Sequence, residues 1–119
     1  MTVMDEFQIK ILGDRELMEQ LNEYAMQFTE ELQVERYGIE KDPTNLKFGL
    51  AEVASLVAIA RGAAGVAMLG KKIFELLKGG RGRRIIIQTP MRRIELVSSA
   101  DLTNDEVQEA LKHIIKAAK

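Results

Sequence analysis

The stretch from Leu46 to Leu77 constrains the fold more than any other part of the chain. It consists mainly of Ala, Val, Leu, Ile and Gly, and its apolar residues fall on every side of a helical projection. A helix of that kind is usually buried all round, so the segment predicts the centre of the hydrophobic core. One unbroken helix would fit, but Gly62 and Gly65 each cost about 1 kcal/mol relative to Ala. We therefore prefer a helical hairpin that bends at these glycines and ends at Lys78.

The N-terminal part predicts a strand followed by a helix. Phe7, Ile9 and Ile11 alternate with polar residues, which is the period of a strand with one buried face. Gly13 ends this strand, and Asp14 can accept hydrogen bonds from the first free N–H groups of a helix. Apolar residues then follow at helical spacing, at Leu17, Leu21, Tyr24, Phe28 and Leu32.

Next comes a region rich in turn residues. Val34 to Tyr37 could form a short edge strand, whereas Gly38 to Asn45 (GIEKDPTN) predicts a loop. Within that loop, Asp42 and Pro43 suit the N-cap and first position of a new helix.

The C-terminal part predicts a hairpin and a last helix. Gly79 and Gly80 provide a C-cap for the apolar segment. Two β-rich runs then follow, Arg84 to Gln88 and Arg93 to Val97, separated by a four-residue turn. Thr103 and Glu106 form a capping box, and Leu102 and Val107 can pack across it as a hydrophobic staple. The helix that starts there has one apolar stripe, formed by Val107, Ala110, Leu111, Ile114 and Ala118.

Together these elements predict one α+β domain over residues 1–119, in which a small sheet packs against helices on one face. The sheet would contain the N-terminal strand and the C-terminal hairpin. It would be covered by the N-terminal helix, the glycine-interrupted apolar helical segment and the C-terminal helix. A content of 46% hydrophobic and 29% charged residues is that of a globular chain long enough for one core.

Composition also limits the chemistry. The chain has no cysteine and one histidine, His113, so we expect neither a zinc site nor a cysteine nucleophile. The serines lie in no nucleophile elbow, and neighbouring carboxylates such as Glu30 and Glu31 point to different sides of a helix. We therefore expect no catalytic residue, no cofactor and no metal. The N-terminus has early acidic residues and no apolar signal region, and Arg61 would disfavour membrane insertion of the apolar segment, so we expect a cytoplasmic protein.

One motif resembles a phosphate-binding loop without completing it. Gly65 to Lys71 matches GxxxxGK, but Lys72 stands where Ser or Thr should hold magnesium, and the surrounding residues are helical in character. We expect Gly62, Gly65 and Gly70 to allow close helix packing or self-association instead, so that a homo-oligomer is possible.

A basic segment gives the alternative function. Between residues 71 and 84 the candidate contacts to a nucleic acid or another anionic ligand are Lys71, Lys72, Arg81, Arg83 and Arg84. No aromatic residue for base stacking lies among them apart from Phe74, and the net charge of −1 with a pI of about 5.9 gives no overall basic footprint. We therefore favour a solvated connector over a nucleic-acid site.

The whole chain resembles the effector-associated constant component domains of bacterial conflict and immunity systems. The similar features are the N-terminal strand and helix, the segment FGLAEVASLVAIARGAAGVAMLGKKIFELL, a basic stretch, a hairpin around TPMRRIEL and a closing helix. The resemblance implies a non-enzymatic adaptor that links an effector or sensor domain to a protein partner. The residues themselves point to the same class, an interaction module, because signals for packing are plentiful and catalytic residue types are scarce.

Overall fold

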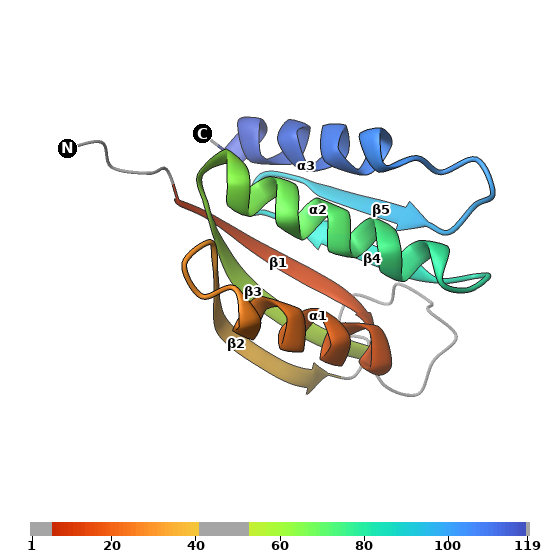
Figure 1. Ribbon diagram of the computed structural model, residues 1–119, viewed down its shortest axis with the longest axis horizontal. Helices are drawn as coiled ribbons and strands as arrows, with labels where there is room; N and C mark the ends of the chain where they lie inside the picture. Colours follow the sequence, from red (N-terminus) through yellow and green to blue (C-terminus); the bar gives the residue numbers. More distant parts are fainter. Residues whose placement is uncertain (1–5, 41–52, 119) are drawn as a thin grey trace.

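The computed structural model describes residues 6–40 and 53–118, which form an α+β fold with one five-stranded antiparallel sheet and three helices (Figure 1). The strand order is β2-β3-β1-β4-β5. The α+β class and the small sheet packed by helices are as predicted from the sequence. The elements are β1 (Glu6–Asp14), α1 (Arg15–Gln27), β2 (Leu32–Glu40), β3 (Val53–Arg61), α2 (Gly62–Lys78), β4 (Arg84–Gln88), β5 (Arg93–Val97) and α3 (Asn104–Ala118).

The N-terminal strand and helix form as predicted. Ile9 and Ile11 are buried in the main core, and Phe7 packs against the same core. At the start of α1 the Asp14 carboxylate accepts a hydrogen bond from the backbone N–H of Glu16 at 2.9 Å. The helix is shorter than the apolar spacing suggested, because it ends at Gln27 and Leu32 already belongs to β2.

The prediction of a helical hairpin in the apolar segment was wrong in its first half. Residues Val53–Arg61 form β3, which lies between β2 and β1 in the sheet. Only its second half is helical, as α2. The predicted bend is real, but it separates a strand from a helix at Gly62, whose φ of 67° favours glycine. Residues 46–52 of the segment lie outside the described residues.

The reason for the error is that β3 is buried on both of its faces. Ala54, Leu56 and Ala58 face the main core, whereas Val53 on the opposite side clusters with Leu12 and Ile86. A strand with two apolar faces loses the alternation that distinguishes a strand from a buried helix. The alanines added helix propensity, so the local pattern favoured the wrong element.

The possible edge strand at Val34 to Tyr37 is present and is longer than predicted. As β2 it runs from Leu32 to Glu40 and pairs with β3, with a register shift between Val34 and Arg36. Gly38 to Glu40 are therefore strand, and the prediction of a loop was wrong for them. The rest of that loop, with the N-cap predicted at Asp42, lies outside the described residues.

The C-terminal elements agree with their sequence signals. β4 and β5 pair as the predicted hairpin, and Thr103 Oγ1 accepts the N–H of Glu106 at 3.2 Å at the start of α3. Helix α2 ends at Lys78 as predicted. Its C-cap differs in conformation, because Gly79 has a right-handed φ of −76° and the positive φ of 69° occurs at Gly82.

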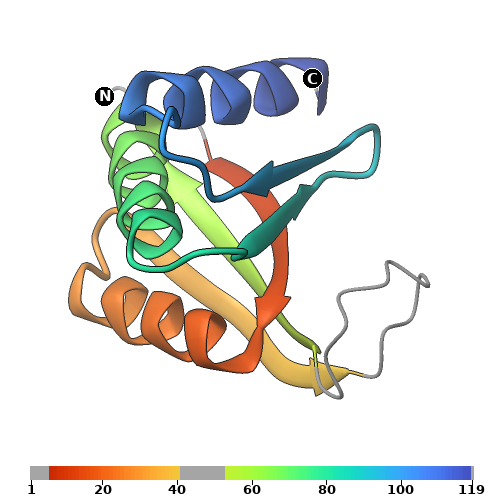
Figure 2. The same cartoon turned by 90° about the vertical axis from the view of Figure 1, so that its right-hand side faces the viewer.

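The main core lies between the sheet and the three helices, which cover the same face of it (Figures 1 and 2). Leu17 and Leu21 of α1, Leu69 and Ile73 of α2, and Leu111 of α3 all contribute to this one cluster. None of the described helices is long and apolar enough to cross a membrane.

Candidate functional site

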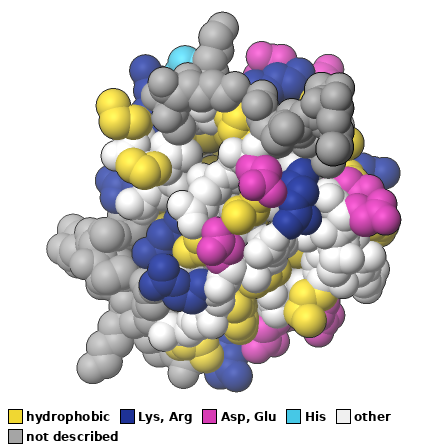
Figure 3. Space-filling model, turned by 90° about the vertical axis from the view of Figure 1, so that its left-hand side faces the viewer, with side chains coloured by type: hydrophobic (Ala, Val, Ile, Leu, Met, Phe, Trp, Pro, Cys, Tyr) yellow, Lys and Arg dark blue, Asp and Glu magenta, His cyan; other side chains and the backbone are white. Residues whose placement is uncertain are grey.

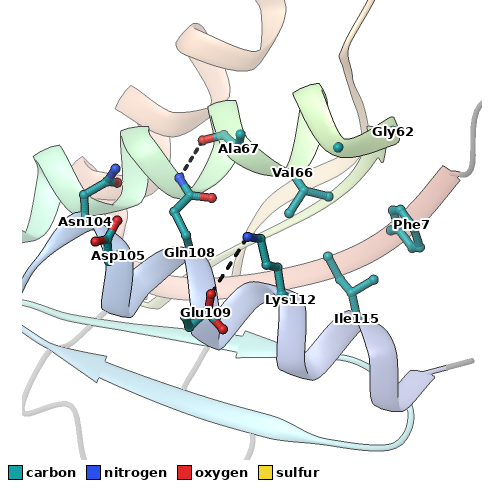
Figure 4. Close-up of a pocket in the computed structure, with 11 residues that line it drawn as sticks. Phe7, Gly62, Val66, Ala67, Asn104, Asp105, Gln108, Glu109, Lys112 and Ile115 are labelled. Atoms are coloured by element: carbon teal, nitrogen blue, oxygen red, sulfur yellow. Dashed lines mark hydrogen bonds and ion pairs between the residues drawn. The ribbon is translucent and has the colours of Figure 1, made fainter.

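A concave surface lies between α2 and α3 and has a volume of about 740 Å³ (Figure 4). We call it the α2–α3 groove. Val66 of α2 and Ile115 of α3 point into it from opposite walls, and Phe7 of β1 closes one end. The other lining residues are Gly62, Ala63, Ala67, Asn104, Asp105, Gln108, Glu109 and Lys112.

Small residues on α2 make this groove possible. Gly62 starts the helix with a positive φ, and Ala63 and Ala67 are exposed on the wall that faces α3. Because their side chains are only methyl groups, the space between the helices stays open.

Next to the groove, at Ala67 and Gly70, the two helices are held close together. A Cβ atom on Gly70 would lie 2.9 Å from Cδ1 of Leu111, so glycine allows the contact with α3. The side-chain amide of Gln108 also donates a hydrogen bond to the carbonyl oxygen of Ala67 at 2.9 Å (Figure 4). This bond joins the two walls and fixes the width of the groove.

The rim of the groove on α3 is charged. Asp105 and Glu109 place two carboxylates there, and Lys112 lies 3.9 Å from Glu109. All three side chains are exposed, so the ion pair contributes little to stability. The groove thus combines an apolar interior with a rim of net negative charge. Such a surface can accept apolar side chains and a basic group of a binding partner.

A second feature fixes the end of the groove where β3 passes into α2. The guanidinium of Arg61 donates to Glu6 Oε2 at 3.0 Å and to the carbonyl oxygen of Thr29 at 2.8 Å, and it also contacts Gln33. It therefore ties β1, the α1–β2 turn and β2 to the last residue before Gly62. At this end of the molecule Figure 3 shows hydrophobic side chains interspersed with both basic and acidic ones.

Three of the five candidate anion contacts interact with other residues of the domain. Lys72 lies 5.4 Å above the ring of Tyr24, Arg83 donates to the carbonyl oxygen of Leu76 at 2.6 Å, and Arg84 lies 3.8 Å from Glu95. Within residues 6–40 and 53–118, only Lys71 and Arg81 of the five make no hydrogen bond, ion pair or ring contact. These contacts give the basic residues structural roles, above all that of Arg83 at the C-terminus of α2.

Gly65, Gly70 and His113 make contacts within the domain. Gly65 is buried, and a Cβ there would lie 2.6 Å from the carbonyl oxygen of Glu31. Gly70 faces α3, so both glycines pack within the domain. The incomplete phosphate-loop motif around them is helical, as part of α2. His113 is exposed on α3, where its ring contacts the guanidinium of Arg92.

Sequence reasoning missed the groove itself. Its walls come from Phe7, from the start of α2 and from α3, which are far apart in the sequence. One signal was present, because the small residues of RGAAG mark the wall of α2. Within the described ranges no group of three His, Asp or Glu residues is arranged to hold a metal ion.

Comparisons with family models, with curated proteins and with solved structures find no match to this chain.

Proposed function

We propose that this chain is a non-enzymatic protein–protein interaction module that recruits an effector or sensor domain, in a bacterial conflict or signalling system. The observation that carries the proposal is the α2–α3 groove, whose interior is formed by Phe7, Val66, Ile115 and the methyl groups of Ala63 and Ala67. An apolar concavity of this size suits a few anchoring side chains of a partner segment.

The charges of the rim specify the partner segment further. Asp105 and Glu109 outnumber Lys112 along the α3 wall, so a segment with a Lys or Arg beside its apolar anchors would be complementary. The occupant of the groove is thus an amphipathic, basic peptide segment of the recruited protein. The resemblance to adaptor domains of conflict systems supports the same class of function.

The test compares two alanines at the start of α2. Ala63 lines the groove, whereas the neighbouring Ala64 is also exposed but does not line it. Ala63→Arg should fill the groove, and Ala64→Arg is the matched control. Tagged wild-type protein and both variants are used for affinity capture from lysate of the source cells, with nuclease and at low and high salt. Captured proteins are then purified and titrated against each variant.

The proposal expects one protein that binds the wild type and Ala64→Arg with equal affinity and binds Ala63→Arg at least about tenfold more weakly. Capture should be insensitive to nuclease. If Ala63→Arg binds every captured protein as the wild type does, or if no protein is captured, the groove is not the recruiting surface. Nucleic acid that is captured at low salt and lost at high salt would instead favour the basic segment.

A further inference from the structure

The two edges of the sheet differ in a way that bears on self-association. β2 has a register shift between Val34 and Arg36, and such an irregularity disrupts the ladder that another strand would need. β5 has a regular register with β4 from end to end. In the described part of the chain no strand lies beyond β5, so its outer edge is the one suited to pairing.

Hydrogen bonds at the two ends of the hairpin show which backbone groups of β5 point outward. The N–H of Thr89 donates to the carbonyl oxygen of Arg92 at 2.8 Å, and that of Ser98 donates to the carbonyl oxygen of Arg83 at 2.9 Å. Hydrogen-bonded and non-hydrogen-bonded pairs alternate along an antiparallel ladder. The N–H and C=O groups between these two bonds therefore point away from β4 at Arg93, Glu95 and Val97.

The sequence of this edge is complementary to itself. We propose that two copies of the chain associate through β5 about a two-fold axis at Ile94, which gives one antiparallel sheet of ten strands, five from each copy. In this register the outward N–H and C=O groups of Arg93 form hydrogen bonds with those of Glu95 in the second copy. On the other side of the axis, Glu95 of the first copy pairs in the same way with Arg93 of the second. Two opposite-charge cross-strand pairs result.

Charge selects this register over its neighbours. A two-fold axis at Glu95 would place Glu95 opposite Glu95 of the second copy, and an axis at Arg93 would place two arginines opposite each other. Like charges directly opposite in a ladder are destabilising. The axis at Ile94 also brings Val97, which is 45% exposed, beside the turn of the other copy that carries Met91, which is 71% exposed. Two large apolar side chains of each copy would thus be covered.

Helix α3 would lie close to the second copy. It lies next to β5 (Figure 1). A shallow hollow of about 560 Å³ on its surface is lined by Glu106, Ala110 and His113 and shares Asp105 and Glu109 with the rim of the α2–α3 groove.

The test uses charge reversal and its rescue, with molar mass measured by sedimentation equilibrium over a range of protein concentrations. The wild type should be a dimer in equilibrium with monomer. Arg93→Glu places Glu opposite Glu95 twice and should raise the dissociation constant about tenfold or more. The double variant R93E/E95R restores opposite charges and should recover the dimer. Arg36→Glu makes the same reversal on the other edge strand and should leave the dimer intact.

Circular dichroism checks that each variant is folded. A wild type that is monomeric at all concentrations would overturn the proposal. So would a dimer that Arg93→Glu leaves unchanged, or one that dissociates in Arg36→Glu instead. This inference is independent of the proposed function, because Ala63→Arg should not change the molar mass.

Discussion

Gly65 allows the sharpest prediction about stability, because its replacement sets two known effects against each other. In an open helix Gly→Ala would stabilise the chain by about 1 kcal/mol. Here the added Cβ would lie 2.6 Å from the carbonyl oxygen of Glu31 and 3.2 Å from the carbonyl carbon of Ala60. Both are backbone atoms, so no side chain can rotate to make room. The carbonyl oxygen of Glu31 also accepts the N–H of Arg61 at 2.8 Å, and a shift would weaken that bond.

The net effect follows from these three contributions. Overpacking costs about 1 to 3 kcal/mol, a weakened hydrogen bond about 1 kcal/mol, and helix propensity returns about 1 kcal/mol. Gly65→Ala should therefore destabilise the protein by about 2 kcal/mol, or roughly 8 °C in melting temperature for a chain of this size. Urea unfolding followed by circular dichroism measures the free energy directly.

Gly38 supplies the matched control for this prediction. It lies in β2, and a Cβ there would have no atom within 4 Å. Gly38→Ala should be neutral or stabilise the chain by up to about 1 kcal/mol through the unfolded state. If Gly65→Ala proves as stable as Gly38→Ala, or more stable than the wild type, then close packing against the α1–β2 turn does not determine the glycine at position 65.

Three further predictions concern single side chains. Arg61→Met should lower the free energy of unfolding by about 2 kcal/mol in urea titrations, because it leaves carbonyl groups of the α1–β2 turn without their donor. Thr103→Ala should cost about 1 kcal/mol in the same assay through loss of the α3 N-cap, and Thr103→Ser should not. Tyr37→Phe should stabilise the chain by about 1 kcal/mol at neutral pH, because the buried Tyr37 hydroxyl has no hydrogen-bond partner in the described structure. Burial, and after it Glu19, raises the pKa of Tyr37 in the folded chain. The contribution of Tyr37 to the free energy of unfolding should therefore be constant below about pH 10 and fall above it, because this tyrosine ionises first in the unfolded chain. Unfolding curves at alkaline pH should show a smaller fall for Tyr37→Phe.

The elements that sequence reasoning predicted correctly are those specified by local chemistry. Asp14 and Thr103 cap the helices that follow them, and both caps depend on residues at most three positions apart. The β4–β5 hairpin likewise has its partners next to each other in the chain.

The strand β3 could not be recognised in that way, because its neighbours are distant. Its partners are β1, whose paired residues lie 39 to 55 positions earlier, and β2, which the sequence indicated only as a possible short strand. Ile9 opposite Ala58 and Ile11 opposite Leu56 show why both strands appear apolar on the core side. The small residues Ala54, Ala58 and Ala60 are used to let helices pack closely on the sheet, not to form a helix.

The candidate site depended even more on distant contacts. The sequence singled out Gly62 and Gly70 for close packing; Gly70 packs against α3, whereas Gly62 lines the α2–α3 groove. It contained no sign that Phe7 and Ile115 would complete the same groove, because only the folded chain brings β1 and α3 together. In the basic segment, Lys72, Arg83 and Arg84 each contact a different partner within the domain, and these contacts too depend on the folded chain.

The two proposed surfaces belong to different parts of the fold, because the α2–α3 groove is lined by β1, α2 and α3 whereas the contact between copies uses the edge strand β5. Gln108, Lys112 and Ile115 line the α2–α3 groove, and no residue of β5 does. Because β5 does not line the groove, pairing through β5 would leave both grooves of the dimer open. A dimer with two open grooves can bind two segments of one partner, and linkage of two binding events raises the overall affinity without any new contact. Arg93→Glu should then weaken capture of a multimeric partner while leaving the affinity for a single peptide segment unchanged.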